Sequence, residues 1–85
     1  MAYRHAPQLA WQRIEGEAVI IDLARGRTLG LNPVGSLIWA LVPDHPEAAI
    51  AEEVSRQFDV PYEEARLDVS AFLRSLQDGG LVLVA

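Results

Sequence analysis

The sequence predicts an α+β fold, a winged-helix-like arrangement in which a three-stranded antiparallel sheet is followed by three helices (βββααα). Three observations predict it. Between residues 9 and 31, short and mostly apolar runs are separated by glycine-containing turns, as in strands joined by hairpins. After residue 33 the apolar residues recur at helical spacing, and prolines divide this part into three segments. The chain has 85 residues, the size of one small domain with a single core.

The three strands differ in how clearly the sequence marks them. The first begins at Leu9 and alternates imperfectly between apolar and polar residues. Residues 18–23 are apolar and rich in β-branched side chains, which is the strongest strand signal in the chain. A turn at Gly26 leads to residues 27–31, which are expected to pair back and complete a meander.

The chain before the first strand has no periodic pattern. Residues 1–8 are therefore interpreted as an N-terminal tail, and a single domain is expected to span residues 9–85.

The three helices are bounded by recognisable start and stop residues. Asn32 and Pro33 begin the helix expected at 33–42, because asparagine caps free N–H groups and proline is tolerated at the first helical position. Further prolines open helices at 46–58 and 62–78, and the last of these ends at two consecutive glycines. On this last helix the spacing predicts a core stripe of Ala65, Val69, Phe72 and Leu76.

Composition excludes several classes of function. Hydrophobic residues make up 51% of the chain, which is enough for a packed core. The formal net charge is −5, with seven arginines and no lysine, which argues against nucleic acid as a partner. No apolar run approaches the length of a membrane span, and the N-terminus lacks a signal-peptide core. A cytoplasmic protein with no membrane partner is expected.

The residues needed for catalysis or metal binding are missing from the pattern. There is no cysteine, and the two histidines are His5, in the expected tail, and His45, in an expected turn. Adjacent glutamates on a helix point about 100° apart and do not converge on a substrate. The glycines match no phosphate-binding motif. We therefore expect no enzyme activity, no metal and no cofactor.

A combination of short motifs resembles the PqqD-like family, over about residues 15–82. The motifs of the front half are Ile21-Asp22-Leu23, Gly26, Gly30-Leu31-Asn32, Gly35 and Ile38-Trp39. Those of the back half are Ile50-Ala51, Phe58-Asp59-Val60, Asp68-Val69, Phe72-Leu73, Leu76 and Gly80-Leu81. Each motif is short and mostly apolar, so the specificity lies in their order and spacing.

The resemblance implies a non-catalytic binding protein with a winged-helix-like fold. Members of the family recognise the leader peptide of a ribosomally synthesised precursor, which adds as an antiparallel strand beside the third strand and the third helix. Because the chain ends without a fused catalytic domain, the resemblance implies a separate processing enzyme: a leader peptidase, a cyclase or a radical SAM enzyme. Lasso-peptide biosynthesis is favoured over pyrroloquinoline quinone biosynthesis, from overall likeness to the stand-alone members.

The expected binding site lies between the third strand and the third helix. The candidate peptide-binding residues are Arg27, Thr28, Leu29, Gly30, Leu31, Arg66, Asp68, Val69, Phe72 and Leu73. Gly30 would let a guest backbone approach closely, although a β-bulge is an alternative reason for a glycine there. Arg27, Arg66 or Asp68 would pair with leader charges, and the sequence leaves open which flank of the helix faces the peptide.

The apolar candidates on the third helix carry the same ambiguity. Val69 and Phe72 lie on the expected core stripe, so a purely structural role is the alternative. Leu73 lies off its centre and is the preferred wall of the groove. Trp39 is expected at the margin of the core, as packing or as a partner contact.

Two other functions remain as competing hypotheses. Three helices beside a small sheet also suit a winged-helix DNA-binding module, in which the third helix would read the duplex. That helix carries more acidic than basic residues, which fits phosphate binding poorly. The other hypothesis is a structural subunit or a carrier for another protein. A free strand edge leaves the oligomeric state open.

Overall fold

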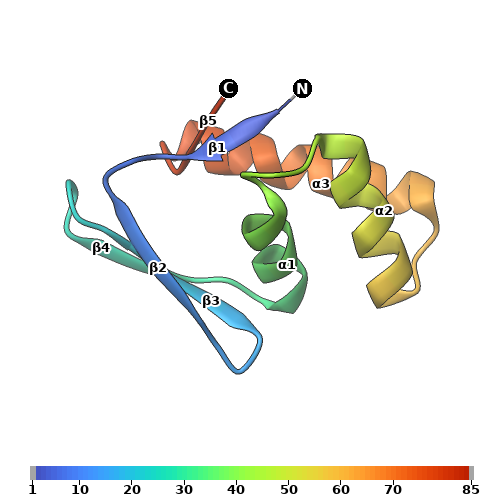
Figure 1. The fold of residues 1–85 in the computed structure, drawn as a ribbon, viewed down its shortest axis with the longest axis horizontal. Coiled ribbons are helices and arrows are strands. Elements are labelled where there is room, and N and C mark those ends of the chain that lie inside the picture. The colour runs from blue at the N-terminus through green and yellow to red at the C-terminus, as the bar shows by residue number, and fades with distance from the viewer. Residues whose placement is uncertain (1, 85) are drawn as a thin grey trace.

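A small antiparallel sheet and three helices form the molecule, with the helices together on one side of the sheet (Figure 1). The structure is a computed structural model that describes residues 2–84; residues 1 and 85, at the ends of the expected tail and domain, lie outside that description. The strands are β1 (Tyr3–His5), β2 (Leu9–Ile14), β3 (Glu17–Asp22), β4 (Arg27–Gly30) and β5 (Val82–Val84). The helices are α1 (Pro33–Leu41), α2 (Glu47–Phe58) and α3 (Tyr62–Asp78). The predicted βββααα order is confirmed.

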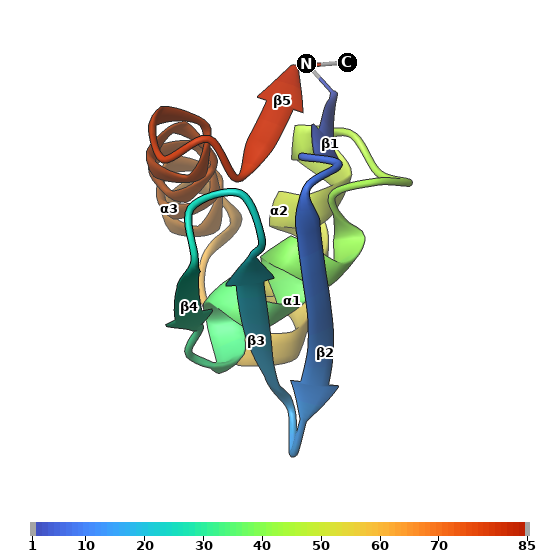
Figure 2. The same ribbon diagram turned by 90° about the vertical axis from the view of Figure 1, so that its left-hand side faces the viewer.

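The main sheet has the order β2-β3-β4, with every neighbouring pair antiparallel (Figure 2). A two-residue turn joins β2 to β3, and both of its residues have positive φ, 52° at Glu15 and 83° at Gly16. Such turns match the twist of a hairpin and fix its register. The register is regular, with Ile14 opposite Glu17 in one pair of strands and Val19 opposite Gly30 in the other. Both β2 and β4 are therefore edge strands.

The expectation that residues 1–8 form a tail is wrong for residues 3–5. Tyr3–His5 forms β1, which pairs with β5 so that the two chain ends run side by side (Figure 1). Tyr3 and Ala6 are buried, and Ala6 N–H donates to the Leu81 carbonyl at 3.0 Å. The His5 ring stacks on Trp39 with centroids 3.8 Å apart. A strand of three residues has no readable period, and its partner lies at the far end of the chain.

The helix boundaries agree closely with those expected. The Asn32 side chain accepts the Gly35 N–H at 2.7 Å, which is the predicted cap of α1. The chain leaves α2 through Asp59, which adopts a left-handed conformation with φ of 54°. After α3, Gly80 has φ of 75° and Leu81 N–H reaches back to Leu76 O, which closes the helix end as glycine permits.

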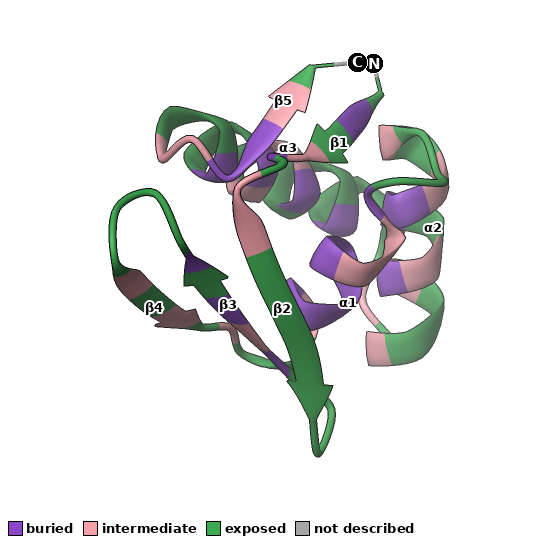
Figure 3. Ribbon diagram, turned by 60° about the vertical axis from the view of Figure 1, so that its left-hand side comes forward, coloured by how far each residue is buried: buried purple, intermediate pink, exposed green. Residues whose placement is uncertain are grey.

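The core lies between the sheet and the helices. Figure 3 shows buried residues on β3, α1 and the inner side of α3, whereas β2 is mostly exposed. Trp39 is fully buried, so its expected place at the margin of the core is wrong. Its ring is covered by the His5 side chain and touched edge-on by Trp11.

A buried serine joins α1 to the sheet where β4 ends. The Ser36 hydroxyl accepts the Ala18 N–H at 2.7 Å and donates to the Leu31 carbonyl at 3.1 Å. The hydroxyl thus bridges the Ala18 N–H and the Leu31 carbonyl, which would otherwise bond to each other in the ladder between β3 and the chain that follows β4. Ser36 has no exposed surface, so this link anchors the start of α1 against the sheet.

Candidate peptide-binding edge and groove

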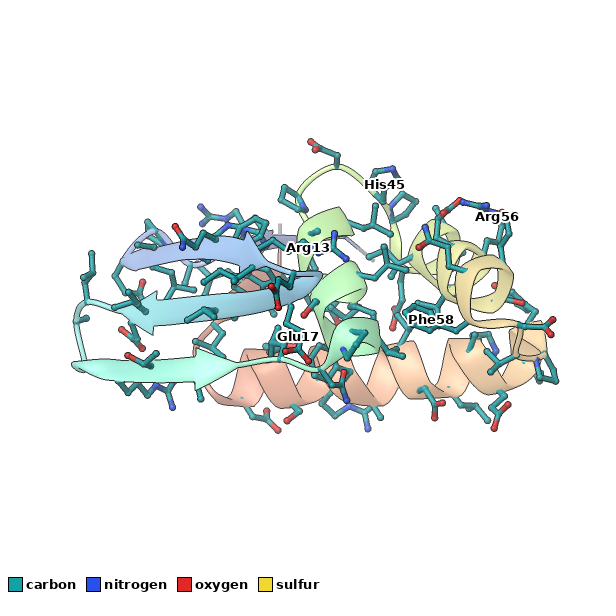
Figure 4. All side chains as sticks on the ribbon, turned by 90° about the horizontal axis from the view of Figure 1, so that it is seen from below. Arg13, Glu17, His45, Arg56 and Phe58 are labelled. Carbon is teal, nitrogen blue, oxygen red and sulfur yellow. The ribbon has the colours of Figure 1, made fainter. Side chains whose placement is uncertain are left out.

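The exposed backbone row predicted on the third strand is present on β4. The Leu31 N–H donates to Ala18 O at 2.9 Å. Along an edge strand of an antiparallel ladder, residues whose backbone groups bond to the neighbouring strand alternate with residues whose backbone groups point away from it. Leu29 therefore bonds to β3, whereas the N–H and C=O groups of Thr28 and Gly30 face away from the sheet. Figure 4 shows β4 on the side of the sheet where α3 runs. Two residues thus present four free backbone groups toward a possible guest strand.

The β-bulge considered for Gly30 is absent. Gly30 pairs one-to-one with Val19, and the next residue continues the same register. Its φ lies outside the left-handed region, and no atom would contact a side chain built at this position. Among residues 2–84, no steric contact requires glycine at this position. Close approach of a guest strand, the other reason considered for a glycine at this position, stays a prediction.

Beyond the end of β4 a small hollow opens between α1 and α3. Its volume is about 150 Å³. The lining residues are Asn32, Val34, Gly35, Ile38, Asp68 and Phe72. Most of these side chains are apolar, and the Asp68 carboxylate is the one acidic group among them. The hollow therefore suits an apolar side chain whose neighbour or tip is positively charged or donates a hydrogen bond.

The Phe72 ring is seated against a glycine of α1. A Cβ atom on Gly35 would lie 2.9 Å from Phe72 Cζ, which is closer than real side chains come. Gly35 thus creates the space that the ring occupies, despite the roughly 1 kcal/mol that glycine costs inside a helix. Phe72 consequently stays half-buried at the surface, where one side of its ring is accessible from the hollow.

The buried stripe of α3 differs from the predicted one at a single place. Leu73, the preferred wall of the groove, has no exposed surface, and Val69 has none either. Neither side chain can contact a guest in this conformation. Phe72, which was assigned to the stripe, is the residue that reaches the hollow. Because Phe72 and Leu73 are adjacent on the helix, spacing alone did not decide which of them faces inward.

The predicted leucines of the strand and the predicted charged residues of α3 differ in their surroundings. Leu29 and Leu31 are half-buried and pack on the core. Arg66 lies on the opposite flank of α3 from the hollow; it forms an ion pair with Glu63, lowering the pKa of that carboxyl, and lines a separate depression with Glu47. Of the two charged residues predicted on α3 to contact the leader, Asp68 lines the hollow beyond the end of β4, and Arg66 does not.

Arg27 does not offer a free charge at the strand edge. Its Nε lies 3.4 Å from Asp22 Oδ2, and its Nη2 donates to the Gly79 carbonyl at 2.5 Å. Asp22 is fully buried and also accepts the N–H groups of Ala24 and Arg25. The predicted pairing of Arg27 with a leader charge would have to compete with these contacts.

Sequence reasoning missed part of the hollow. Asn32, Val34, Gly35 and Ile38 were assigned only structural positions in the helix that follows the strand. A glycine in the first turn of a helix was the available signal, because glycine is costly in a helix unless something packs closely against it. Sequence reasoning also gave no role to Arg25, whose guanidinium donates to the Gly79 carbonyl, because that partner lies far along the chain.

Three other features considered in the sequence are His45, a metal site and a membrane span. His45 is exposed, with Nδ1 lying 3.1 Å from the Leu41 carbonyl oxygen. Among residues 2–84, no three histidine, aspartate or glutamate side chains gather in a way that would hold a metal ion. Across the same residues, none of the helices has the length and apolar character of a membrane span.

Comparison with known proteins supplies an independent line of evidence. The family described as "Coenzyme PQQ synthesis protein D (PqqD)" matches residues 17–82. The fold is similar to a solved structure described as "TbiB1 in Complex with the TbiA(beta) Leader Peptide", with a TM-score of 0.86, 26% identity and 93% of each chain covered. It is equally similar, with a TM-score of 0.86, to "Lasso peptide synthetase B1 complexed with the leader peptide", at 25% identity over 98% of this chain and 99% of the other. No curated protein matches.

Proposed function

Since the chain belongs to the PqqD family, we propose that it recognises the leader peptide of a ribosomally synthesised precursor and presents it to a separate processing enzyme. The observation that carries the proposal is the open edge of β4, where Thr28 and Gly30 leave four backbone groups unpaired beside the hollow at Phe72. An antiparallel guest strand would satisfy these groups and place alternate side chains toward α3.

The energetics require both parts of this site. Each added backbone hydrogen bond contributes roughly 0.5–1.5 kcal/mol net, so the four groups of Thr28 and Gly30 supply only a few kcal/mol. Ordering a flexible peptide costs about 2–5 kcal/mol or more. A buried apolar anchor adds about 1.5–3 kcal/mol, and the hollow lined by Phe72 is the place for one. Affinity in the micromolar to high-nanomolar range follows, which allows the carrier to release its cargo.

The pathway we propose is lasso-peptide biosynthesis rather than pyrroloquinoline quinone biosynthesis. The support is that a lasso peptide synthetase B1 in complex with a leader peptide shares this fold over nearly the whole length of both chains. The protein itself is proposed to be non-catalytic. The proposed partners are therefore a precursor leader and a leader peptidase, cyclase or radical SAM enzyme.

The uncovered face of the sheet supports docking of such an enzyme. Ile14 and Ile21 are 50% and 42% exposed, and with Ala10 and Val19 they line a hollow of about 270 Å³ on that face. An antiparallel sheet usually turns polar side chains outward, so exposed apolar ones suggest a partner. A leader strand beside β4 would extend this same face. Ile21→Ser should therefore leave leader affinity unchanged and slow enzyme-dependent processing; unchanged processing would exclude this docking surface.

The DNA-binding alternative has weaker support. The exposed surface of α3 carries Glu63, Glu64 and Asp68, and Arg66 already pairs with Glu63. Phosphate binding needs free positive charge, and it weakens steeply with added salt. Strand addition depends on backbone hydrogen bonds and apolar contacts, so its affinity should change little with salt.

A titration tests the proposal directly. The probe is a synthetic leader peptide of a candidate lasso-peptide precursor, added to isotope-labelled protein and followed by NMR. The amide groups of Thr28 and Gly30 are expected to shift and to gain protection from hydrogen exchange, with little effect of salt. Failure to bind the leader, or salt-sensitive binding of a DNA duplex instead, would overturn the proposal.

A further inference from the structure

Arg25 in the β3–β4 turn and Arg27 at the start of β4 converge on one carbonyl at the end of α3. Arg25 Nη1 donates to Gly79 O at 2.7 Å, and Arg27 Nη2 donates to the same oxygen at 2.5 Å. Asp22 holds the base of this arrangement through Arg27 Nε and the Arg25 N–H. We call Arg25 and Arg27, with the Gly79 carbonyl they share, the arginine clamp.

The clamp is favoured by the local electrostatics. Gly79 follows the last turn of α3, where carbonyl groups have no partner within the helix and the helix dipole is negative. Two guanidinium groups satisfy this carbonyl with charge-assisted hydrogen bonds. Their combined positive charge is offset in part by the fully buried Asp22.

The glycines at the end of α3 leave room for the clamp. A Cβ atom on Gly80 would lie 3.0 Å from Arg25 Nη1, and Gly80 also needs its positive φ to close the helix. The close of α3 and the position of the Arg25 guanidinium therefore depend on the same residue.

The clamp joins the two walls of the proposed groove. β4 is hydrogen-bonded along one edge to β3, and α3 packs mainly on α2 and β5. At one end of the groove Phe72 packs on Gly35, just after β4. At the other end the clamp ties the turn before β4 to the residue after α3. Strand edge and helix are thus connected at both ends of the space between them.

We propose that Arg25 and Arg27 are positioning residues for the leader peptide, an inference that rests on the proposed function. They hold β4 at the distance from α3 at which a peptide bonded to Thr28 and Gly30 also reaches the hollow at Phe72. Neither arginine belongs to the hydrophobic core, and Arg25 is exposed. Their loss loosens the groove without removing buried apolar contacts. Because Arg27→Ala also leaves the buried Asp22 carboxylate without its ion pair, stability is measured beside affinity.

The test compares leader affinity, thermal stability and the NMR signals of the helix end in the double variant Arg25→Ala/Arg27→Ala. Affinity for the precursor leader should fall about tenfold, the effect of losing roughly one good contact. The Gly80 and Leu81 amides should shift and exchange faster in the free protein. Arg27→Lys keeps the positive charge and can donate to one of the two acceptors of Arg27, so in the Arg25→Ala background it should recover part of the affinity that Arg27→Ala loses. Arg56→Ala is the matched control, because Arg56 pairs with Glu53 on α2, away from the groove.

A leader whose acidic residues are changed to amides separates positioning from direct contact. Positioning predicts the same fold-loss for both leaders, whereas a loss confined to the acidic leader would overturn the inference and assign the arginines to charge recognition. Unchanged affinity in the double variant would also overturn it. If the unaltered protein fails to bind any leader, the proposed function fails. The clamp is then judged by whether the Thr28 and Gly30 amides shift when the arginines are removed.

Discussion

Proline substitutions on the two edges of the sheet can identify which edge receives the leader. The N–H of Thr28 points away from β3, so Thr28→Pro removes no hydrogen bond from the folded protein. Proline is tolerated at such edge positions. The fold should therefore persist, with a melting temperature within several degrees of the original.

The effect on binding follows from the same geometry. Thr28→Pro removes a donor that a guest carbonyl would use, which costs roughly 0.5–1.5 kcal/mol for the bond itself. The proline ring also pushes the guest backbone away, so the bond of a neighbouring rung is weakened as well. Together these effects should raise the dissociation constant about tenfold or more. Isothermal titration calorimetry with the precursor leader measures it.

Matched variants make the result decisive. Thr28→Ala keeps the N–H and should bind the leader almost normally. Arg13→Pro makes the same change as Thr28→Pro but on β2, the opposite edge, and should leave affinity unchanged. Ile14 forms the hydrogen-bonded pair with Glu17 at the hairpin turn, so the N–H of the preceding residue, Arg13, points away from β3. Leu29→Pro removes a bond to β3 and should lower stability. If Arg13→Pro impaired binding and Thr28→Pro did not, the leader would add to β2 and the groove assignment would be refuted.

Three further predictions concern a buried hydrogen bond, the effect of pH and the hollow at Phe72. Ser36→Ala leaves the buried Ala18 N–H unsatisfied, which should cost about 1–3 kcal/mol and lower the melting temperature by several degrees, measured by calorimetry. Burial lowers the pKa of His5 below its ordinary 6.5, so its stabilising contribution is complete above that value and is lost as the pH falls below it. Thermal melts at about pH 7.5 and about pH 5.5 should show a smaller pH effect for His5→Gln. Phe72→Ala should weaken leader binding about tenfold by removing an apolar wall of the hollow, whereas Leu67→Ala, on an exposed part of α3, should not.

Much of the fold could be predicted because its signals are local. The cap at Asn32 and the periodicity of α3 depend on residues a few positions apart. The strand β1 could not be predicted, since its partner β5 lies about eighty residues along the chain and neither strand is long enough to show a period. The contacts that hold β1 are its pairing with β5 and the stacking of His5 on Trp39, and both join residues far apart in the sequence.

The open edge of the sheet was predicted correctly, whereas the packing of α3 beside it was not. The strand edge could be placed because outward and inward groups alternate once a meander is assumed. Helical spacing could not predict that Leu73 is buried and Phe72 is not, because both lie near the stripe. The place that the Phe72 ring takes instead is one that a side chain on Gly35 would block. One consequence is that Leu73→Asp should unfold the protein, where the sequence had indicated a surface position.

The shortness of β4 explains how a protein with an open strand edge can remain selective. A long, flat edge would accept any extended chain, including another copy of itself. β4 exposes the backbone groups of only Thr28 and Gly30, and their hydrogen bonds barely offset the cost of ordering a peptide. A guest therefore binds well only if it also carries an apolar side chain at the spacing that reaches the Phe72 hollow. On this reasoning, the backbone edge determines how the leader lies, and the hollow determines which leader is accepted.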